Sequence, residues 1–276
     1  MALRPLRQVS LPEAAAAAND RWLGQLDEQL SAPDADWADI CRETLYALWH
    51  PGHGTYRKRI ADPALSGASL TALLTLDPRN ITLEPEYYAE VDTEKFARVK
   101  PLLWLWYSFD RTPLGGQNVE LGVRLRRLLA PHIFKSCGEN FKAFQFVEFS
   151  FGYNMEVGDN VVVHRYVLLD DRGGISLGNN VSISDFANVY SHTHSIVDQR
   201  DVTDALTRLD DGVRITYHAT VLAGVHVAEQ AMVGAMAVAT KDVRPYHVNV
   251  GIPAKSVRVK PNAPADMDKL TTVKPR

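Results

Sequence analysis

The chain has 276 residues, of which 46% are hydrophobic, and a formal net charge of -3. This composition is ordinary for a globular protein and excludes the strongly basic character that nucleic-acid or anionic-membrane binding favours. Its two cysteines, Cys41 and Cys137, are too few for a disulfide framework, so free thiols and a cytoplasmic location are expected.

The first 132 residues predict a helical region. No signal peptide is expected, because the N-terminus lacks an apolar core of 7–15 residues before a cleavage site. No membrane span is expected, because no apolar run approaches the roughly 20 residues that a membrane helix needs. Residues 1 to about 9 should be untethered. A first helix should begin with Ser10 as its N-cap and end near Pro33. Further helices are expected over residues 36–48, 70–76, 93–109 and 119–129.

Two prolines bear on the last two of these helices. Pro101 should kink its helix or begin a new segment, and Pro131 should end the helix that starts near residue 119. The aromatic residues of this part of the chain, including Trp104, Trp106 and Tyr107, are expected to be core residues.

A six-residue period follows Pro131 and is clearest between Ile215 and Lys255. Aliphatic or small residues recur there in two sets: Ile215, Val221, Val227, Val233 and Ala239, and Ala219, Val225, Ala231, Ala237 and Val243. This period is neither the 3.6 of a helix nor the 2 of a strand, but it is typical of β-helix coils built from three blocks.

The period can be followed back to about residue 135. It predicts a β-helix over residues 133–260, with roughly six or seven coils of about 18 residues, and a polar tail over residues 261–276. Because solenoids need covered ends, the helical region over residues 1–132 is expected to cover the first coil.

The six-residue spacing fails between His194 and Val213. This segment is polar and charged and exceeds one coil by about eight residues, so it should loop out of the solenoid. A two-residue slip earlier in the repeat is assigned to an extra turn at Gly173 and Gly174. The loop beside His192 and His194 is a natural place for a binding site.

Three segments resemble the left-handed β-helix (hexapeptide-repeat) acyltransferases, particularly the maltose, galactoside and nodulation-type O-acetyltransferases. These segments are residues 169–181, which contain Leu-Asp-Asp, residues 190–194, which read Tyr-Ser-His-Thr-His, and residues 233–255. The resemblance implies a left-handed parallel β-helix that forms a homotrimer, with active sites between subunits. It also implies transfer of an acyl group from acyl-CoA, most simply acetyl-CoA, to a hydroxyl of a small-molecule or saccharide acceptor.

The same resemblance implies roles for individual residues. His194 matches the family's catalytic histidine and is expected to be the general base, since a pKa of about 6.5 suits proton transfer near neutrality. His192 is the alternative base or a neighbour that orients substrate. Asp170 matches the acceptor-contacting position and can accept a hydroxyl hydrogen bond or orient the base. Asp171 is expected to be a solvated turn residue.

The coenzyme contacts are implied in the same way. The cations expected near its phosphates are Lys241, Lys255 and Arg258. The residues expected to line the pantetheine groove are Thr240 and the backbone of Gly234 and Ala235.

Two alternatives stay open at this point. The γ-class carbonic anhydrases share the fold and bind zinc through three histidines between subunits, which makes a metal-dependent hydratase the second hypothesis. The close histidine pair of that class is absent here, because His218 and His226 are eight residues apart. No metal site is therefore expected. The third hypothesis is a non-catalytic β-helix scaffold.

Overall fold

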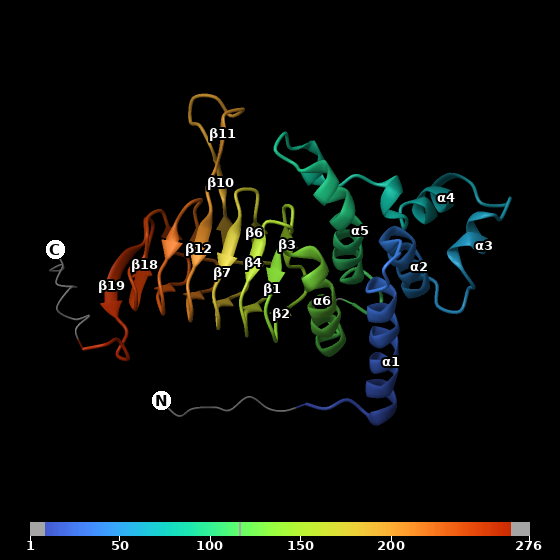
Figure 1. Ribbon diagram of the computed structural model, residues 1–276, viewed down its shortest axis with the longest axis horizontal. Coiled ribbons are helices and arrows are strands. Elements are labelled where there is room, and N and C mark those ends of the chain that lie inside the picture. The colour runs from blue at the N-terminus through green and yellow to red at the C-terminus, as the bar shows by residue number, and fades with distance from the viewer. Residues whose placement is uncertain (1–8, 116, 266–276) are drawn as a thin grey trace.

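The protein was analysed as a computed structural model that describes residues 9–115 and 117–265 (Figure 1). A helical region forms one end of the molecule, and a β-helix of about six coils forms the other. The expectations for residues 1–8 and for most of the tail, residues 266–276, lie outside the described residues. No helix within residues 9–115 and 117–265 is both long and apolar enough to cross a membrane.

The helical region contains six α-helices and two 3-10 helices among the described residues. They are α1 (Glu13–Leu30), α2 (Trp37–Trp49), α3 (Tyr56–Ile60), α4 (Gly67–Leu74), η1 (Pro78–Asn80), η2 (Glu84–Tyr87), α5 (Thr93–Phe109) and α6 (Val119–Ile133). The start of α2 follows the expected capping chemistry, because the Asp36 side chain accepts a hydrogen bond from the backbone N–H of Asp39 at 3.0 Å.

Two predicted helix ends, the start of α1 and the end of α6, were wrong. Helix α1 begins after Pro12 rather than after Ser10. Helix α5 passes through Pro101, so this proline does not begin a new segment. It removes one helical hydrogen bond, and the burial of neighbouring residues such as Leu102 and Leu105 offsets that loss. Helix α6 passes through Pro131, which lies in its last turn, and only then is the helix closed by the Phe134 N–H bond to Ala130 O at 2.8 Å.

The β-helix begins directly after α6. Its strands are β1 (Ser136–Cys137), β2 (Lys142–Ala143), β3 (Glu148–Phe149), β4 (Met155–Val157), β5 (Val162–Val163), β6 (Leu168–Asp170), β7 (Ile175–Leu177), β8 (Ser182–Ile183), β9 (Asn188–Tyr190), β12 (Thr207–Leu209), β13 (Arg214–Ile215), β14 (Thr220–Val221), β15 (His226–Val227), β16 (Met232–Val233), β17 (Val238–Ala239), β18 (His247–Val250) and β19 (Lys255–Val259).

These strands form three sheets, one for each face of the solenoid. Their orders are β1-β4-β7-β12-β15, β19-β18-β16-β13-β8-β5-β2 and β17-β14-β9-β6-β3. Apart from the antiparallel β19, the pairings within them are parallel. Inward residues stack in register from coil to coil: Val189 lies between Leu169 and Val221, and all three are fully buried. The predicted parallel β-helix with a helical N-terminal region is confirmed.

The coil length differs from the prediction in the first half of the solenoid. The backbone N–H of Asp159 bonds to the side chain of Asn179, which is 20 residues further on rather than about 18. The interrupted coil is longer still, because Asn179 bonds to Asp211, 32 residues away. The predicted excess of about eight residues was too small, because it compared Val189 with Ile215, and these residues lie in different sheets.

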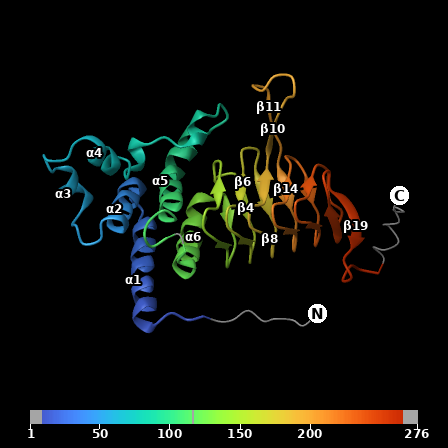
Figure 2. The same ribbon diagram turned by 180° about the vertical axis from the view of Figure 1, so that it is seen from behind.

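The helical region covers the first coil, as expected for a solenoid. The Trp106 indole N–H in α5 donates to the carbonyl of Val147 at 2.9 Å. In α6 the buried Arg126 is paired with the buried Asp110 and also donates to Ala143 O at 3.2 Å. These contacts hold α5 and α6 against the first coil (Figures 1 and 2). At the opposite end, β19 lies antiparallel on β18.

Candidate active site

A β-hairpin leaves the solenoid directly after β9 and projects away from it (Figures 1 and 2). Its strands are β10 (His192–His194) and β11 (Val202–Asp204), which pair antiparallel with His192 opposite Asp204. The coil resumes at β12. The predicted loop beside the two histidines is therefore present, and it takes the form of a hairpin.

Gly173 allows this hairpin to leave the coil. A Cβ atom at this position would lie 2.3 Å from the Ser191 carbonyl oxygen and 2.5 Å from the Ala205 nitrogen, which are both backbone atoms at the base of the hairpin. The Gly173 N–H also donates to the Ser191 hydroxyl at 2.9 Å, and that hydroxyl donates to the Asp170 carbonyl at 2.5 Å. Only glycine fits this close approach.

His192 is held by Asp170. The Nδ1 atom of His192 lies against the Asp170 carboxylate, which is buried and also accepts a hydrogen bond from the Ser150 hydroxyl at 2.5 Å. A carboxylate at Nδ1 favours the tautomer with the proton on that nitrogen, and it leaves Nε2 as the acceptor. The structure thus brings two of the three predicted catalytic residues into direct contact.

His194 lies on the same strand but is more exposed. Its Nδ1 atom is 2.6 Å from the Gln199 carbonyl oxygen within the hairpin. The rings of His192 and His194 have centroids 5.2 Å apart at an angle of 86°. Both rings therefore lie on one side of the hairpin base, but only His192 has a carboxylate partner at Nδ1.

Asp171 was predicted to be a solvated turn residue, and this was wrong. Its side chain is fully buried and accepts hydrogen bonds from the backbone N–H groups of Phe151 at 2.7 Å and Asn154 at 3.2 Å. Burial raises the pKa of Asp171 to about 6, against the lowering effect of these N–H donors. Asp171 therefore holds the chain segment that carries Ser150, the partner of Asp170.

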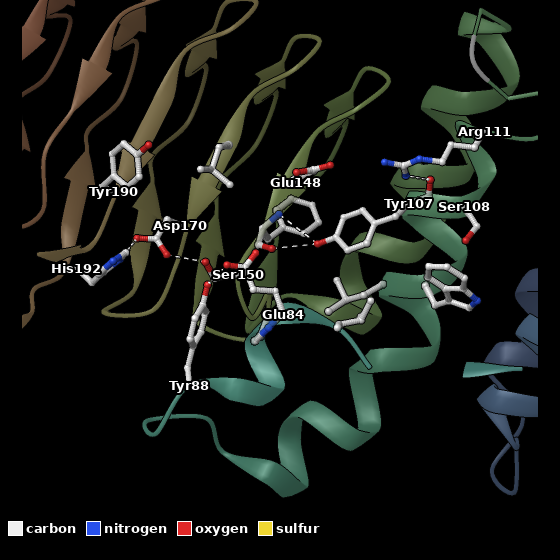
Figure 3. A pocket seen from close by; sticks show the side chains of 16 residues that line it. Glu84, Tyr88, Tyr107, Ser108, Arg111, Glu148, Ser150, Asp170, Tyr190 and His192 are labelled. Atoms are coloured by element: carbon white, nitrogen blue, oxygen red, sulfur yellow. Dashed lines mark hydrogen bonds and ion pairs between the residues drawn. The ribbon is translucent and has the colours of Figure 1, made fainter. Parts of the chain in front are cut away.

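A cavity of about 410 Å³ opens beside the His192–Asp170 pair, between the solenoid and the helical region (Figure 3). The solenoid contributes residues of β3, β6 and β9. The helical region contributes Tyr88 after η2, and Trp104 and Tyr107 from α5. Of the three aromatic residues predicted to be core, only Trp106 is fully buried, whereas Trp104 and Tyr107 are partly buried.

Tyr88 forms one wall of this cavity and was missed from the sequence. Its hydroxyl donates to Glu84 at 2.6 Å, and the Arg172 guanidinium lies 4.1 Å from its ring centroid. Burial, with a further effect from Glu84, raises the pKa of Tyr88 to about 12, so the phenol stays protonated near neutrality. No local pattern marks this residue, because its position depends on how η2 packs beside β6.

The residues expected to bind the coenzyme lie further along the solenoid. Thr240 and Lys241 follow β17 directly and are exposed. Strand β17 is two strands from β9 in the same parallel sheet, so Thr240 and Tyr190 follow strands that are two coils, or about 10 Å, apart. Lys241 therefore lies along the same edge of the solenoid as His192.

The other predicted coenzyme residues lie at the preceding corner and on the last strand. Gly234 is buried, and a Cβ there would lie 2.5 Å from a methyl carbon of Val250, whereas Ala235 is exposed. Lys255 and Arg258 are exposed on β19, where Arg258 lies opposite Val248. The structure thus places Thr240 and Lys241 on the edge that carries His192, and it places Lys255 near the same strand, because the N–H of the adjacent Ala254 donates to the Val238 carbonyl of β17 at 2.8 Å.

The histidines of the coils are the candidate metal ligands of this fold. His226 is paired with Asp210 at 2.7 Å on an exposed face. Within the part of the chain that the structure describes, no three His, Cys, Asp or Glu side chains come together as a set of metal ligands.

Comparisons with known proteins were made for the whole chain. No protein-family profile matches it. The galactoside O-acetyltransferase of Escherichia coli (strain K12) is 26% identical over 140 residues, which span 49% of this chain and 69% of that enzyme. A maltose O-acetyltransferase from Clostridium difficile 630 superposes with a TM-score of 0.55 at 23% identity, over 63% of this chain and 91% of that chain.

A second solved structure, a galactoside acetyltransferase in complex with coenzyme A, gives the same TM-score of 0.55 at 24% identity, over 66% of this chain and 88% of that chain. These structural likenesses show that the chain has the solenoid fold of hexapeptide-repeat acetyltransferases.

Proposed function

We propose that the chain is an acetyltransferase-type enzyme related to the hexapeptide-repeat O-acetyltransferases, and that it moves an acyl group from acyl-CoA to a hydroxyl acceptor. The observation that carries this proposal is the pairing of His192 with the buried Asp170 at the mouth of a cavity. A histidine oriented by a carboxylate is suited to take a proton from a hydroxyl as the oxygen attacks.

We assign the general base to His192, with His194 beside it. The resemblance to the O-acetyltransferases favours His194, but two features of the geometry support His192 better. Its partner is a carboxylate, which stabilises the imidazolium formed by proton transfer, whereas the partner of His194 is a neutral carbonyl. Its ring also lines the cavity.

The reaction needs no covalent enzyme intermediate. His192 Nε2 takes the hydroxyl proton of the acceptor while the acceptor oxygen forms a bond to the thioester carbonyl carbon. The tetrahedral intermediate then collapses, the carbon–sulfur bond breaks, and the CoA sulfur receives the proton from His192. The products are an ester and free CoA, and the histidine returns to its neutral form.

Acyl-CoA is proposed as the donor, with acetyl-CoA as the simplest case. Two similar structures hold coenzyme A or acetyl-CoA. The chain offers suitable groups, because Lys241 and Lys255 are exposed and form no ion pair among residues 9–115 and 117–265. Lysines of this kind can contact the 3′-phosphate and pyrophosphate, and Thr240 lies on the edge that leads to His192.

A homotrimer is proposed as the assembly, and two apolar features of the surface support contacts between copies. Ile196 and Val197 at the hairpin tip are 103% and 91% exposed. Along one corner of the solenoid, rings stack from coil to coil at centroid distances of 4.9 Å: Phe146, Tyr166, Phe186 and His218. An apolar hairpin tip and a row of surface rings are both typical of surfaces through which proteins associate.

The function is tested by following CoA release from acetyl-CoA with a thiol reagent, in the presence of a panel of alcohols. We expect acceptor-dependent thiol release with an equal amount of acetyl ester, identified by mass spectrometry. Thiol release that does not depend on any acceptor, with no ester formed, would contradict the proposal.

A further inference from the structure

We propose that the cavity between the helical region and the solenoid is the acceptor site, and that it selects a neutral alcohol with an aromatic or alicyclic body over a free saccharide. This inference rests on the proposed acyl transfer, because it places the acceptor hydroxyl at His192. The cavity of about 410 Å³ is large enough for a one- or two-ring molecule.

The two residues proposed for proton transfer lie at one end of the cavity. His192 and Asp170 lie at the solenoid end, and the rings of Tyr88 and Tyr107 lie between them and the helical region (Figure 3). Trp104 of α5 also lines the cavity. An alcohol with its hydroxyl at His192 therefore extends its body between aromatic side chains. Aromatic and alicyclic groups gain from such contacts through burial and edge or stacked packing.

Three of the hydroxyl groups along the cavity already have protein partners. The Tyr88 hydroxyl donates to Glu84 at 2.6 Å, and the Tyr107 hydroxyl donates to the Phe149 carbonyl at 3.1 Å. The Ser150 hydroxyl donates to Asp170. A saccharide would place several hydroxyl groups against these occupied groups, and each unpaired hydroxyl costs about 1–3 kcal/mol.

The charged residues at the rim favour a neutral acceptor. Arg111 and Glu148 both line the cavity and are exposed, and neither forms an ion pair among the described residues. Their charges are opposite, so the rim as a whole attracts neither an anion nor a cation strongly. The remaining carboxylates, Glu84 and Asp170, are engaged by Tyr88 and His192.

Trp104 sets the length of the acceptor. A second cavity of about 790 Å³ lies within the helical region and shares Trp104, Ser108 and Arg111 with the first. The indole N–H of Trp104 donates to the Thr75 carbonyl at 2.9 Å, which fixes the ring between the two cavities. A smaller side chain at this position would join them and admit a longer alcohol.

The test compares acceptors and wall variants in the full-length protein. Acetyl transfer is measured with 2-phenylethanol, cyclohexylmethanol, 4-phenyl-1-butanol and methyl galactoside, at saturating acetyl-CoA. We expect the ring alcohols to have kcat/KM values at least about 10-fold above that of the saccharide. Tyr88→Ala should raise the KM for 2-phenylethanol about 10-fold and leave the KM for acetyl-CoA unchanged. Trp104→Leu should raise kcat/KM for 4-phenyl-1-butanol relative to 2-phenylethanol.

The matched control is Tyr87→Ala. Tyr87 precedes Tyr88, is 74% exposed and does not line the cavity, so its loss should leave every kinetic constant unchanged. Acetyl transfer that prefers methyl galactoside, or that is insensitive to both wall variants, would overturn the inference.

A binding measurement separates this inference from the proposed function. Calorimetric titration with 2-phenylethanol should give a dissociation constant that rises about 10-fold in Tyr88→Ala and does not change in Tyr87→Ala. If this holds while no acetyl ester forms with any alcohol, the proposed function fails and the ligand class stands. If transfer occurs but 2-phenylethanol does not bind in this way, the acceptor site lies elsewhere and the inference fails.

Discussion

The Nδ1 atom of His192 lies against the carboxylate of Asp170, a residue 22 positions earlier in the chain. The contact exists because β6 and β9 lie on successive coils, with Asp170 in register with Tyr190. The coil stacking therefore builds the pair to which we assign the proton transfer, and the departure of the hairpin at Ser191 places His192 beside the cavity. Four features of the chain lead to further predictions.

Replacing Gly173 by alanine should displace the hairpin base. The new Cβ would meet the Ser191 oxygen and the Ala205 nitrogen at distances that real atoms do not adopt, so the backbone must shift. A shift of about 1 Å at His192 should lower kcat of acetyl transfer roughly 10²-fold. Gly24→Ala in α1 is the matched control, since no atom lies within 4 Å of its new Cβ. Unchanged kcat in Gly173→Ala would show that the hairpin base is not constrained in this way.

Ionisation of Asp171 should lower the free energy of unfolding as the pH rises from 4 to 7. Its pKa is about 6 in the folded state and near 3.8 in the unfolded state, so the folded state holds the proton more tightly between these values. The stability contributed by protonated Asp171 is full below about pH 4 and is lost as the pH passes 6. The contribution of Asp171 to the free energy of unfolding should fall by up to about 3 kcal/mol between these two pH values.

The measurement compares urea unfolding of the wild type and Asp171→Asn across this pH range. Other carboxylates are common to both proteins, so the unfolding free energy of the wild type minus that of the variant should fall with rising pH. Parallel pH profiles would show that Asp171 is ionised throughout.

The buried ion pair between Arg126 and Asp110 should dominate the stability of the contact between the helical region and the first coil. Both side chains are almost fully buried, and Asp110 also accepts the Phe146 N–H at 2.7 Å. Arg126→Met leaves a buried carboxylate without its cation and should cost about 3–5 kcal/mol in urea unfolding. Arg126→Met combined with Asp110→Leu should recover part of that loss. A double variant less stable than Arg126→Met would contradict this account.

Lys241 and Lys255 should bind the coenzyme phosphates without taking part in the chemical step. The double replacement by alanine should raise the KM for acetyl-CoA about 10-fold or more, equivalent to about 1.4 kcal/mol, and leave kcat at saturation near that of the wild type. Lys58→Ala in α3 is a control for the loss of an exposed charge far from the solenoid. An unchanged KM in the double variant would place the phosphates elsewhere.

The solenoid was predictable because its core repeats. A small apolar residue at every sixth position, as from Ile215 to Ala239, follows directly from a coil of three short strands, and the sequence records it. The 20-residue length of the first coils was not predictable in the same way. The two extra residues of each of these coils lie at one corner, because the inward residues Phe149 and Val157, and likewise Leu169 and Leu177, are eight positions apart instead of six. Of these two corners, only the second was marked in the sequence, by the slip at Gly173 and Gly174.

The candidate site was predictable where its residues lie on the repeat. Asp170, His192 and His194 were identified because they match motifs of the O-acetyltransferases, and the two histidines also lie beside the break in the six-residue period. The contact between His192 and Asp170 was not predictable, because the sequence does not show which of the two histidine rings reaches the buried carboxylate. The opposite wall was missed because nothing near Tyr88 or Trp104 in the sequence shows that α5 and η2 pack against β3 and β6.

The central claim is that His192, held by Asp170, is the general base. Its most direct test is kcat for acetyl transfer at saturating substrates in His192→Ala, His194→Ala and Asp170→Asn. We predict a loss of about 10²–10⁴-fold for His192→Ala, a smaller but clear loss for Asp170→Asn, and less than about 10-fold for His194→Ala. A loss of 10²-fold or more in His194→Ala, with turnover retained in His192→Ala, would contradict the claim and assign the base to His194.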